Sequence, residues 1–125
     1  LGGSILSHHL DFMPQVTMGQ WLTEHGPIHS MIDISDGLAK DLSRILEASS
    51  VGAELVAVQI PISTDARTLS AWDGKTPLTH ALTDGEDFEL LFTADEETSL
   101  RLDTAAKAQD SGKCFSSPAA QTIAL

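Results

Sequence analysis

The stretch MIDISDGL, residues 31–38, predicts a junction between a buried strand and an amphipathic helix. An apolar run leads into the junction, and apolar residues at helical spacing follow it. Between them stand two carboxylates and one hydroxyl, on Asp33, Ser35 and Asp36. The junction therefore gathers polar side chains where a helix begins.

The start of a helix favours anions, because its first backbone N–H groups are unpaired and lie at the positive end of the helix dipole. A capping carboxylate and a bound phosphate are both stabilised there. Asp33 and Asp36, with Ser35 between them, can also supply oxygen ligands to a hard cation such as Mg²⁺. The residues alone leave a second interpretation open, in which Ser35 or Asp36 only caps the helix and Asp33 is a solvated strand end.

An apolar stripe predicts the helix that follows, because it has the spacing of one buried face. The stripe consists of Leu38, Leu42, Ile45 and Leu46. The polar residues between them predict a solvated face and are Lys40, Asp41, Arg44 and Glu47. Ser49-Ser50 with Gly52 should end the helix.

A second stretch, residues 83–93, combines a glycine turn with acidic and aromatic residues. Phe88, Leu90 and Phe92 share one face of a strand by the period of two, so Glu86 is expected on the same face at the leading end. A carboxylate at the mouth of a sheet is well placed to meet a ligand. A polar loop that leads into an ordinary core strand remains the alternative.

The other elements are predicted from periodicity and turn residues. We expect a lead-in segment over 1–14 with a flexible Gly2-Gly3, a helix over 15–25, a strand over 28–34, a second strand over 53–60, a helix cap at 63–65, a short helix over 77–82 and a helix over 95–110. Cys114-Phe115 is expected to open a last strand, and residues 116–125 to form a loop or tail.

The composition indicates one globular domain, with 125 residues of which 42% are hydrophobic. Seven basic against 18 acidic residues give a net charge of −11, which argues against a nucleic-acid partner. No apolar run approaches the roughly 20 residues of a membrane helix. The single cysteine, Cys114, excludes an internal disulfide and fits a reducing cytosol. No signal peptide is visible at the amino terminus. The first residue is not Met, which suggests a piece of a longer chain.

His8-His9 with Asp11 offers metal-ligand side chains close together. Without a second cluster at zinc-like spacing, an exposed connection between domains is the favoured interpretation.

Three motifs together resemble the carboxy-terminal domain of the thiamine-monophosphate kinase family. They are the segments 9–14, 31–38 and 84–93, in the family's order and approximate spacing. This resemblance implies membership of the aminoimidazole ribonucleotide synthetase-like superfamily and an α/β (α+β) fold, a mixed sheet covered by helices. Residues 1–125 would then be the single carboxy-terminal domain of a two-domain enzyme.

The resemblance also implies an activity, the transfer of the γ-phosphoryl group of ATP to thiamine monophosphate with Mg²⁺. Asp33 and Asp36 would bind Mg²⁺, Ser35 would contact the nucleotide, and Glu86 would contact the thiamine moiety. No residue stands out as a general base, and an attacking phosphate does not require a strong one. The fragment alone would be inactive without the amino-terminal domain, and the whole protein would be a cytoplasmic homodimer.

Two departures from the family pattern concern substrate recognition. Asp84 stands where the family commonly has a first glycine, and no segment after Cys114 matches the family's aromatic substrate contact. Two alternatives therefore stay open. One is a sibling of the superfamily, such as a hydrogenase-maturation factor or a selenophosphate synthetase, and the other is a non-catalytic module that binds a partner or a nucleotide.

Overall fold

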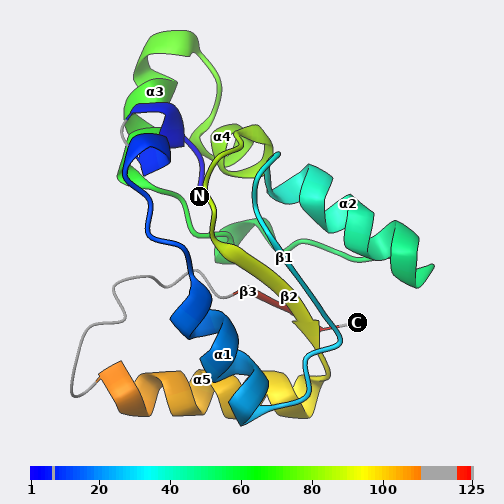
Figure 1. The fold of residues 1–125 in the computed structure, drawn as a ribbon. Coiled ribbons are helices and arrows are strands. Elements are labelled where there is room, and N and C mark those ends of the chain that lie inside the picture. The colour runs from blue at the N-terminus through cyan, green and yellow to red at the C-terminus, as the bar shows by residue number, and fades with distance from the viewer. Residues whose placement is uncertain (7, 111–120, 125) are drawn as a thin grey trace.

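The computed structural model describes residues 1–6, 8–110 and 121–124. Its helices and strands are, in chain order, α1 (Val16–His25), β1 (Ser30–Asp33), α2 (Leu38–Ser49), α3 (Thr64–Asp73), α4 (Pro77–Thr83), β2 (Leu90–Ala94), α5 (Glu96–Asp110) and β3 (Gln121–Ala124) (Figure 1). Short 3₁₀ turns are η1 (Ser4–Leu6), η2 (His8–Leu10) and η3 (Ala57–Gln59). None of the helices in these residues has the length and apolar composition that crossing a bilayer requires.

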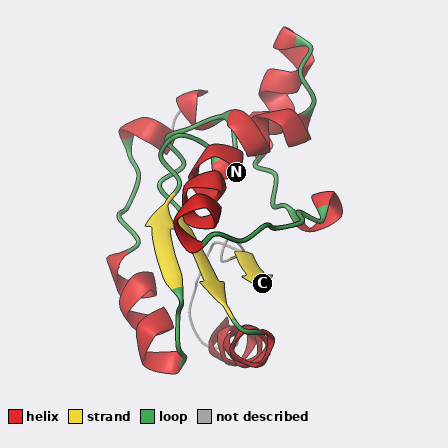
Figure 2. Ribbon diagram, turned by 90° about the vertical axis from the view of Figure 1, so that its right-hand side faces the viewer, coloured by secondary structure: helices red, strands yellow, loops and turns green. Residues whose placement is uncertain are grey.

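The three strands form one mixed sheet in the order β1-β2-β3. β1 runs antiparallel to β2, with Ser30 opposite Thr93 and Asp33 opposite Leu90. β2 runs parallel to β3, with Leu91 opposite Gln121. Helices lie on both sides of this sheet, as Figure 2 shows. The predicted α/β (α+β) class, a mixed sheet covered by helices, is therefore confirmed.

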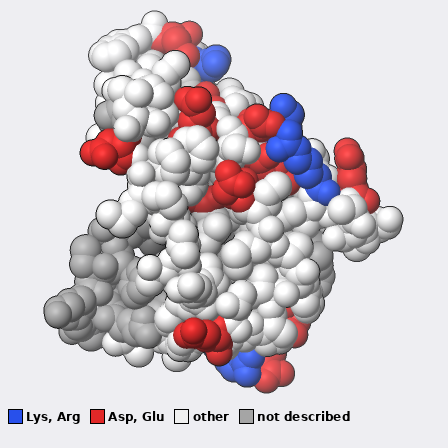
Figure 3. All heavy atoms as spheres, viewed as in Figure 1, with Lys and Arg blue, Asp and Glu red and all other residues white. Residues whose placement is uncertain are grey.

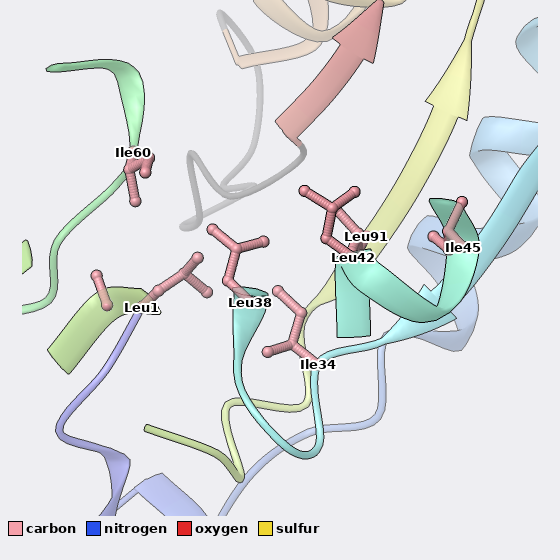
Figure 4. Packing of buried hydrophobic residues seen from close by; sticks show 8 residues of the cluster. Leu1, Ile34, Leu38, Leu42, Ile45, Ile60 and Leu91 are labelled. Carbon is pink, nitrogen blue, oxygen red and sulfur yellow. The ribbon is translucent and has the colours of Figure 1, made fainter. Parts of the chain in front are cut away.

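Each face of the sheet carries its own hydrophobic core, because neighbouring side chains of β2 point to opposite faces. Leu91 packs with residues of α2, α4 and the β1–α2 connection (Figure 4). Phe92 lies in a second cluster with Leu22 of α1 and Leu102 of α5. The first of these two cores lies beneath the strand-to-helix junction at residues 31–38.

The apolar stripe of α2 is buried as expected, with Leu38, Leu42 and Ile45 in the first core. The helix ends at Ser49, and its C-cap Ser50 has a left-handed φ of 55°. The predicted solvated face is wrong at Asp41, which is 0% exposed. Burial of this carboxylate requires partners of its own, and they lie at the candidate site described below.

The expected strand over 53–60 is wrong. Ala57–Gln59 form the 3₁₀ turn η3, and the preceding residues are irregular. Val58 is 92% exposed and Val56 50% exposed, so the alternating valines pack against no face. β-Branched residues favour a strand only where a partner strand and a buried face receive them.

The carboxyl end also differs from the expectation in part. Residues 121–124, within the predicted loop or tail over 116–125, form β3 instead. The sheet position beside β2 explains this difference, because the ladder with β2 pairs the backbone groups on one edge of these residues. The predicted strand start at Cys114-Phe115 lies outside the described residues.

The lead-in segment is packed rather than flexible at its glycines. Gly2 donates its N–H to Asp87, and Gly3 donates to Asp84 Oδ2 over 2.9 Å. Both glycines have left-handed φ angles, 81° and 73°. A Cβ on Gly2 would lie 2.4 Å from the backbone of His80, so only glycine fits this close approach.

Candidate functional site

The connection between β1 and α2 comprises residues 34–37 and carries two of the four predicted site residues, Ser35 and Asp36. Ile34 anchors it in the core with 2% exposure, whereas Asp36 is exposed and Ser35 half-buried. The N-cap position of α2 is occupied by Gly37, with a φ of 107°. The alternative in which Ser35 or Asp36 caps α2 is therefore wrong, and both side chains remain for other partners.

Buried Asp41 supports this connection from inside α2. Its Oδ2 atom accepts the backbone N–H groups of Ser35 and Asp36, over 2.9 and 2.8 Å. Its Oδ1 atom accepts from Arg44 Nη1. A charge-assisted bond to a backbone N–H is stronger than a neutral one, so Asp41 fixes the path of residues 35–36.

Asp36 lies beside two cations of α2. Its Oδ2 atom is 3.1 Å from Lys40 Nζ, and it also forms an ion pair with Arg44. Hydrogen bonds from Lys40, and then from Arg44, hold the pKa of Asp36 below its usual range. The carboxylate is therefore ionised at neutral pH and can exchange these cations for another.

Asp33 ends β1, opposite Leu90, and is exposed. It adjoins the connection that carries Ser35 and Asp36, three residues before Asp36. Mg²⁺ is commonly held by one or two carboxylates together with waters and substrate phosphates. Two exposed carboxylates fit part of such a donor set, although Asp36 must first leave Lys40 and Arg44.

A complete protein cage for a metal is absent from residues 1–6, 8–110 and 121–124, where no three His, Cys, Asp or Glu side chains are placed to hold an ion. The metal-ligand interpretation of His8, His9 and Asp11 stays untested as a set, because the side chain of His8 lies outside what the structure describes. His9 Nδ1 lies 2.9 Å from the carbonyl oxygen of Ser4 and is used there.

Backbone hydrogen bonds join the two motif stretches directly. Ile34 donates to the carbonyl of Glu89 over 2.8 Å and accepts from Phe88 over 2.9 Å. Glu86 then donates its N–H to the carbonyl of Ser35 over 2.9 Å. Residues 34–35 and 86–89 are therefore neighbours, although about fifty residues separate them in the sequence.

Gly85 permits this approach. A Cβ at Gly85 would lie 2.5 Å from the carbonyl oxygen of Ser35, and a real Cβ cannot come so near. Gly37 is confined in the same way, because a Cβ there would lie 3.0 Å from the backbone of Thr83. Gly85 thus allows the backbone of Ser35 to approach, and Gly37 allows the backbone of Thr83 to approach.

Glu86 is exposed on this loop but does not lead into the strand by simple alternation. β2 begins at Leu90, and both Glu86 and Phe88 have left-handed φ angles of 62° and 52°. The period-two expectation is therefore wrong before residue 90. Left-handed non-glycine residues cost of order 1–3 kcal/mol each and cluster at ligand-binding loops.

The segment 9–14 meets the same loop through an aromatic contact. The rings of Phe12 and Phe88 are stacked, with centroids 4.0 Å apart and planes inclined by 23°. The structure therefore brings all three motif segments together around residues 85–88.

A pocket of about 370 Å³ opens beside Glu86. Its polar lining includes Ser4, Asp73, Lys75, His80, Asp84 and Glu86. Asp and Glu side chains gather on this part of the surface, above the sheet and toward α3 and α4 (Figure 3). The excess of carboxylates favours a ligand that carries positive charge near this wall.

Buried His80 organises the wall of the pocket. Its Nδ1 atom lies 2.8 Å from Asp84 Oδ2, and its Nε2 atom lies 3.3 Å from Asp73 Oδ1. The backbone N–H of Lys75, with a smaller contribution from His80, holds the pKa of Asp73 below its usual range. Asp84, the departure from the family pattern, is thus tied to both His80 and Gly3.

Sequence reasoning missed Asp41 and His80. Asp41 lies between the apolar positions of the helix and carries a charge, so the pattern predicted that it is exposed. The local signal is the spacing alone, because a carboxylate one turn inside the helix can reach back to the N–H groups of the connection five and six residues earlier. His80 had no such signal, since its partners come from α3 and the following loop.

This fold, with its paired motif loops, defines a member of a known domain family. Residues 10–115 match the family described as AIR synthase related protein, C-terminal domain, and the chain belongs to that family.

Thiamine-monophosphate kinases are among the similar proteins. That of Rhodopirellula baltica is 46% identical over 101 residues, 80% of this chain and 32% of the relative. That of Escherichia coli K12 is 38% identical over 101 residues, 81% of this chain and 30% of the relative. The chain thus spans about a third of the length of these curated relatives. The resemblance drawn from the three motifs is confirmed.

A solved structure agrees with this similarity. AaThiL complexed with AMPPCP and TMP superposes with a TM-score of 0.61 and 28% sequence identity. The match covers 71% of this chain and 28% of that chain.

Proposed function

We propose that this chain is the carboxy-terminal domain of a thiamine-monophosphate kinase, which transfers the γ-phosphoryl group of ATP to thiamine monophosphate and forms thiamine diphosphate. Support comes from the thiamine-monophosphate kinases that resemble it over this domain. The similar structure of AaThiL is a complex with TMP and with AMPPCP, an analogue of ATP. An amino-terminal domain would complete the enzyme.

One observation carries the proposal, the hydrogen bond from Glu86 N–H to the carbonyl of Ser35. It holds the loop with the proposed substrate contact against the loop with the proposed nucleotide contact. Phosphoryl transfer depends chiefly on positioning of donor and acceptor and on charge neutralisation. Two loops fixed side by side are suited to that task.

Within this proposal, Asp33 and Asp36 hold Mg²⁺, and the hydroxyl of Ser35 contacts the nucleotide. Bound Mg²⁺ neutralises phosphate charge, which a chain of net charge −11 would otherwise repel. Asp36 contributes an ionised carboxylate, and hydrogen bonds from Lys40 and Arg44 lower its pKa further.

Glu86 contacts the thiamine moiety. The thiazolium ring carries a positive charge, and the acidic pocket beside Glu86 is complementary to it. The chain's part in the reaction is to bind and orient, and a phosphate oxygen of thiamine monophosphate attacks without a strong base.

Assay of the full-length protein tests this function. With Mg²⁺, ATP and thiamine monophosphate, chromatography should detect thiamine diphosphate and ADP in equal amounts. Asp33→Ala should abolish turnover, whereas Asp103→Ala, which removes an exposed carboxylate of α5 that pairs with Lys107, should not. Wild-type turnover and unchanged Mg²⁺ dependence in Asp33→Ala would refute the metal role.

The same assay separates the alternatives. A sibling of the superfamily, such as a selenophosphate synthetase or a hydrogenase-maturation factor, would consume ATP without phosphorylating thiamine monophosphate. A non-catalytic module would bind Mg²⁺ and ATP in calorimetry without turnover. The proposal also includes a homodimeric, cytoplasmic enzyme, which light scattering and cell fractionation would test.

A further inference from the structure

We propose that Asp41 is a positioning residue, which fixes the ligand-binding shape of residues 35–36 and their distance from the Glu86 loop. Asp41 does not touch the ligand in this proposal, because its side chain is fully buried. The inference rests on the proposed function for the identity of the ligand, a magnesium nucleotide.

The contacts of Asp41 differ from those of an ordinary helix cap. A cap satisfies N–H groups in the first turn of its helix, which here begins at Leu38. Asp41 instead accepts from Ser35 and Asp36, which precede the N-cap. Its two bonds therefore shape the connection rather than the helix.

Asp41 is coupled to the substrate side through Ser35. The N–H of Ser35 is held by Asp41, and its carbonyl accepts from Glu86. Asp41 thus holds the peptide unit before Ser35, and Asp41 and Glu86 together hold the unit after it, through the N–H of Asp36 and the carbonyl of Ser35. A shift of Ser35 that follows loss of Asp41 would move both the nucleotide contact and the Glu86 loop.

Arg44 gives Asp41 a second role. The guanidinium contacts Asp41 through Nη1 and Asp36 through Nη2. When Asp36 turns to Mg²⁺, Arg44 loses one carboxylate but keeps the other. Asp41 thereby retains a paired counter-ion in its buried position, so that ligand binding leaves no buried charge unpaired.

Hydrogen exchange and nucleotide affinity together test the proposal in the full-length protein. Asp41→Ala should raise amide exchange at least tenfold in the peptide that covers residues 34–37. It should also weaken Mg²⁺–AMPPCP binding in calorimetry by about 100-fold, the upper end for loss of a carboxylate that supports a metal site. Asp41→Asn, which keeps one acceptor oxygen, should weaken binding by about tenfold.

Leu42→Ala is the matched control. It removes a buried side chain from the next position of the same helix but leaves the hydrogen bonds of both loops in place, so it separates a loss of stability from a loss of positioning. All variants are compared at a temperature at which each is folded. Leu42→Ala should leave nucleotide affinity within about twofold of wild type, since the residues it affects lie in the core.

Two results would overturn the proposal. One is an Asp41→Ala protein with the exchange and affinity of Leu42→Ala. The other, decisive if Asp41→Ala does not fold, is wild-type affinity in Asp41→Asn. Asp36→Ala tests the proposed function separately. If Asp36→Ala binds Mg²⁺–AMPPCP with wild-type affinity, the proposed metal role of Asp36 is wrong. Amide exchange at residues 34–37 in Asp41→Ala then still decides the role of Asp41.

Discussion

In the part of the chain that the structure describes, two junctions between a strand and the next helix differ in what their carboxylates contact. Between β2 and α5 stands one residue, Asp95, whose side chain accepts the N–H of Thr98 over 2.7 Å. This bond is the main cause of its lowered pKa. Between β1 and α2 stand four residues, 34–37, and the carboxylate of Asp36 contacts cations instead.

The difference shows how a junction can leave a carboxylate exposed and free of the helix backbone. At β2–α5, the carboxylate of Asp95 accepts a hydrogen bond from the backbone of the helix that follows. At β1–α2 the N-cap is a glycine, and a second carboxylate, Asp41, is buried behind the connection to hold it. Asp36 then stays exposed and ionised, as a metal ligand should be.

The largest expected effect is a difference in turnover between the variants Asp36→Ala and Asp95→Ala. Asp36→Ala should lower turnover of the full-length enzyme by more than about 100-fold, since loss of a direct ligand exceeds that of a supporting residue. The Tm of Asp36→Ala should differ little from that of the wild type, because the ion pairs of Asp36 are exposed. Steady-state kinetics with Mg²⁺ varied provides the measurement. Equal turnover in both variants would show that the carboxylates of the two junctions do not differ in function.

The close approach of the two motif loops should be the next most sensitive feature. Gly85→Ala places a Cβ 2.5 Å from the Ser35 carbonyl and should destabilise the fold by about 1–3 kcal/mol. Gly52→Ala is its control, because nothing lies within 4 Å of that position. Urea denaturation measures both. A Gly85→Ala protein as stable as Gly52→Ala would show that the loops do not touch.

Asp95→Ala should have a smaller effect, confined to stability. Loss of the side-chain bond to Thr98 N–H should lower Tm by about 4 °C, as for other helix caps. Turnover at 25 °C should stay at the wild-type level. Calorimetry measures the Tm, and the kinase assay measures the turnover. A loss of turnover without a change in Tm would contradict the expectation.

The smallest effect concerns the pKa of Asp36. Lys40→Ala removes the largest cause of its lowering, so the pKa should rise toward the unfolded value of about 3.9. Because the folded pKa is the lower one, the ion pairs stabilise the fold above about pH 4, and this contribution disappears as pH falls through the folded pKa. Carboxyl NMR titration measures the shift. Lys107→Ala, which removes the exposed partner of Asp103, should leave it unchanged.

Local patterns predicted much of this molecule. The stripe from Leu38 to Ile45 and the cap at Ser63, which accepts from Ala66 N–H, depend only on neighbouring residues and are confirmed. The two motif stretches also stand out from their residues alone. Their close approach depends on glycines that the sequence displays openly, at positions 37 and 85.

Long-range contacts explain what the sequence did not reveal. The valines of 53–60 suggested a strand, but a strand requires a neighbour, which no local pattern specifies. Asp41 looked solvent-facing because its backbone donors belong to a connection that folds back over it. Gly2-Gly3 looked flexible because its partners, Asp84 and Asp87, lie more than eighty residues away in the sequence.

That last contact has a consequence for folding order. The bond between Gly2 N–H and Asp87 closes a span of 85 residues, whereas Asp41 and Ser35 are six residues apart. Contacts that close long loops form late, because the chain entropy they remove is larger. The junction at 31–38 can thus take shape before the Glu86 loop is joined to the lead-in segment. The two motif stretches therefore acquire their supporting contacts at different stages of folding.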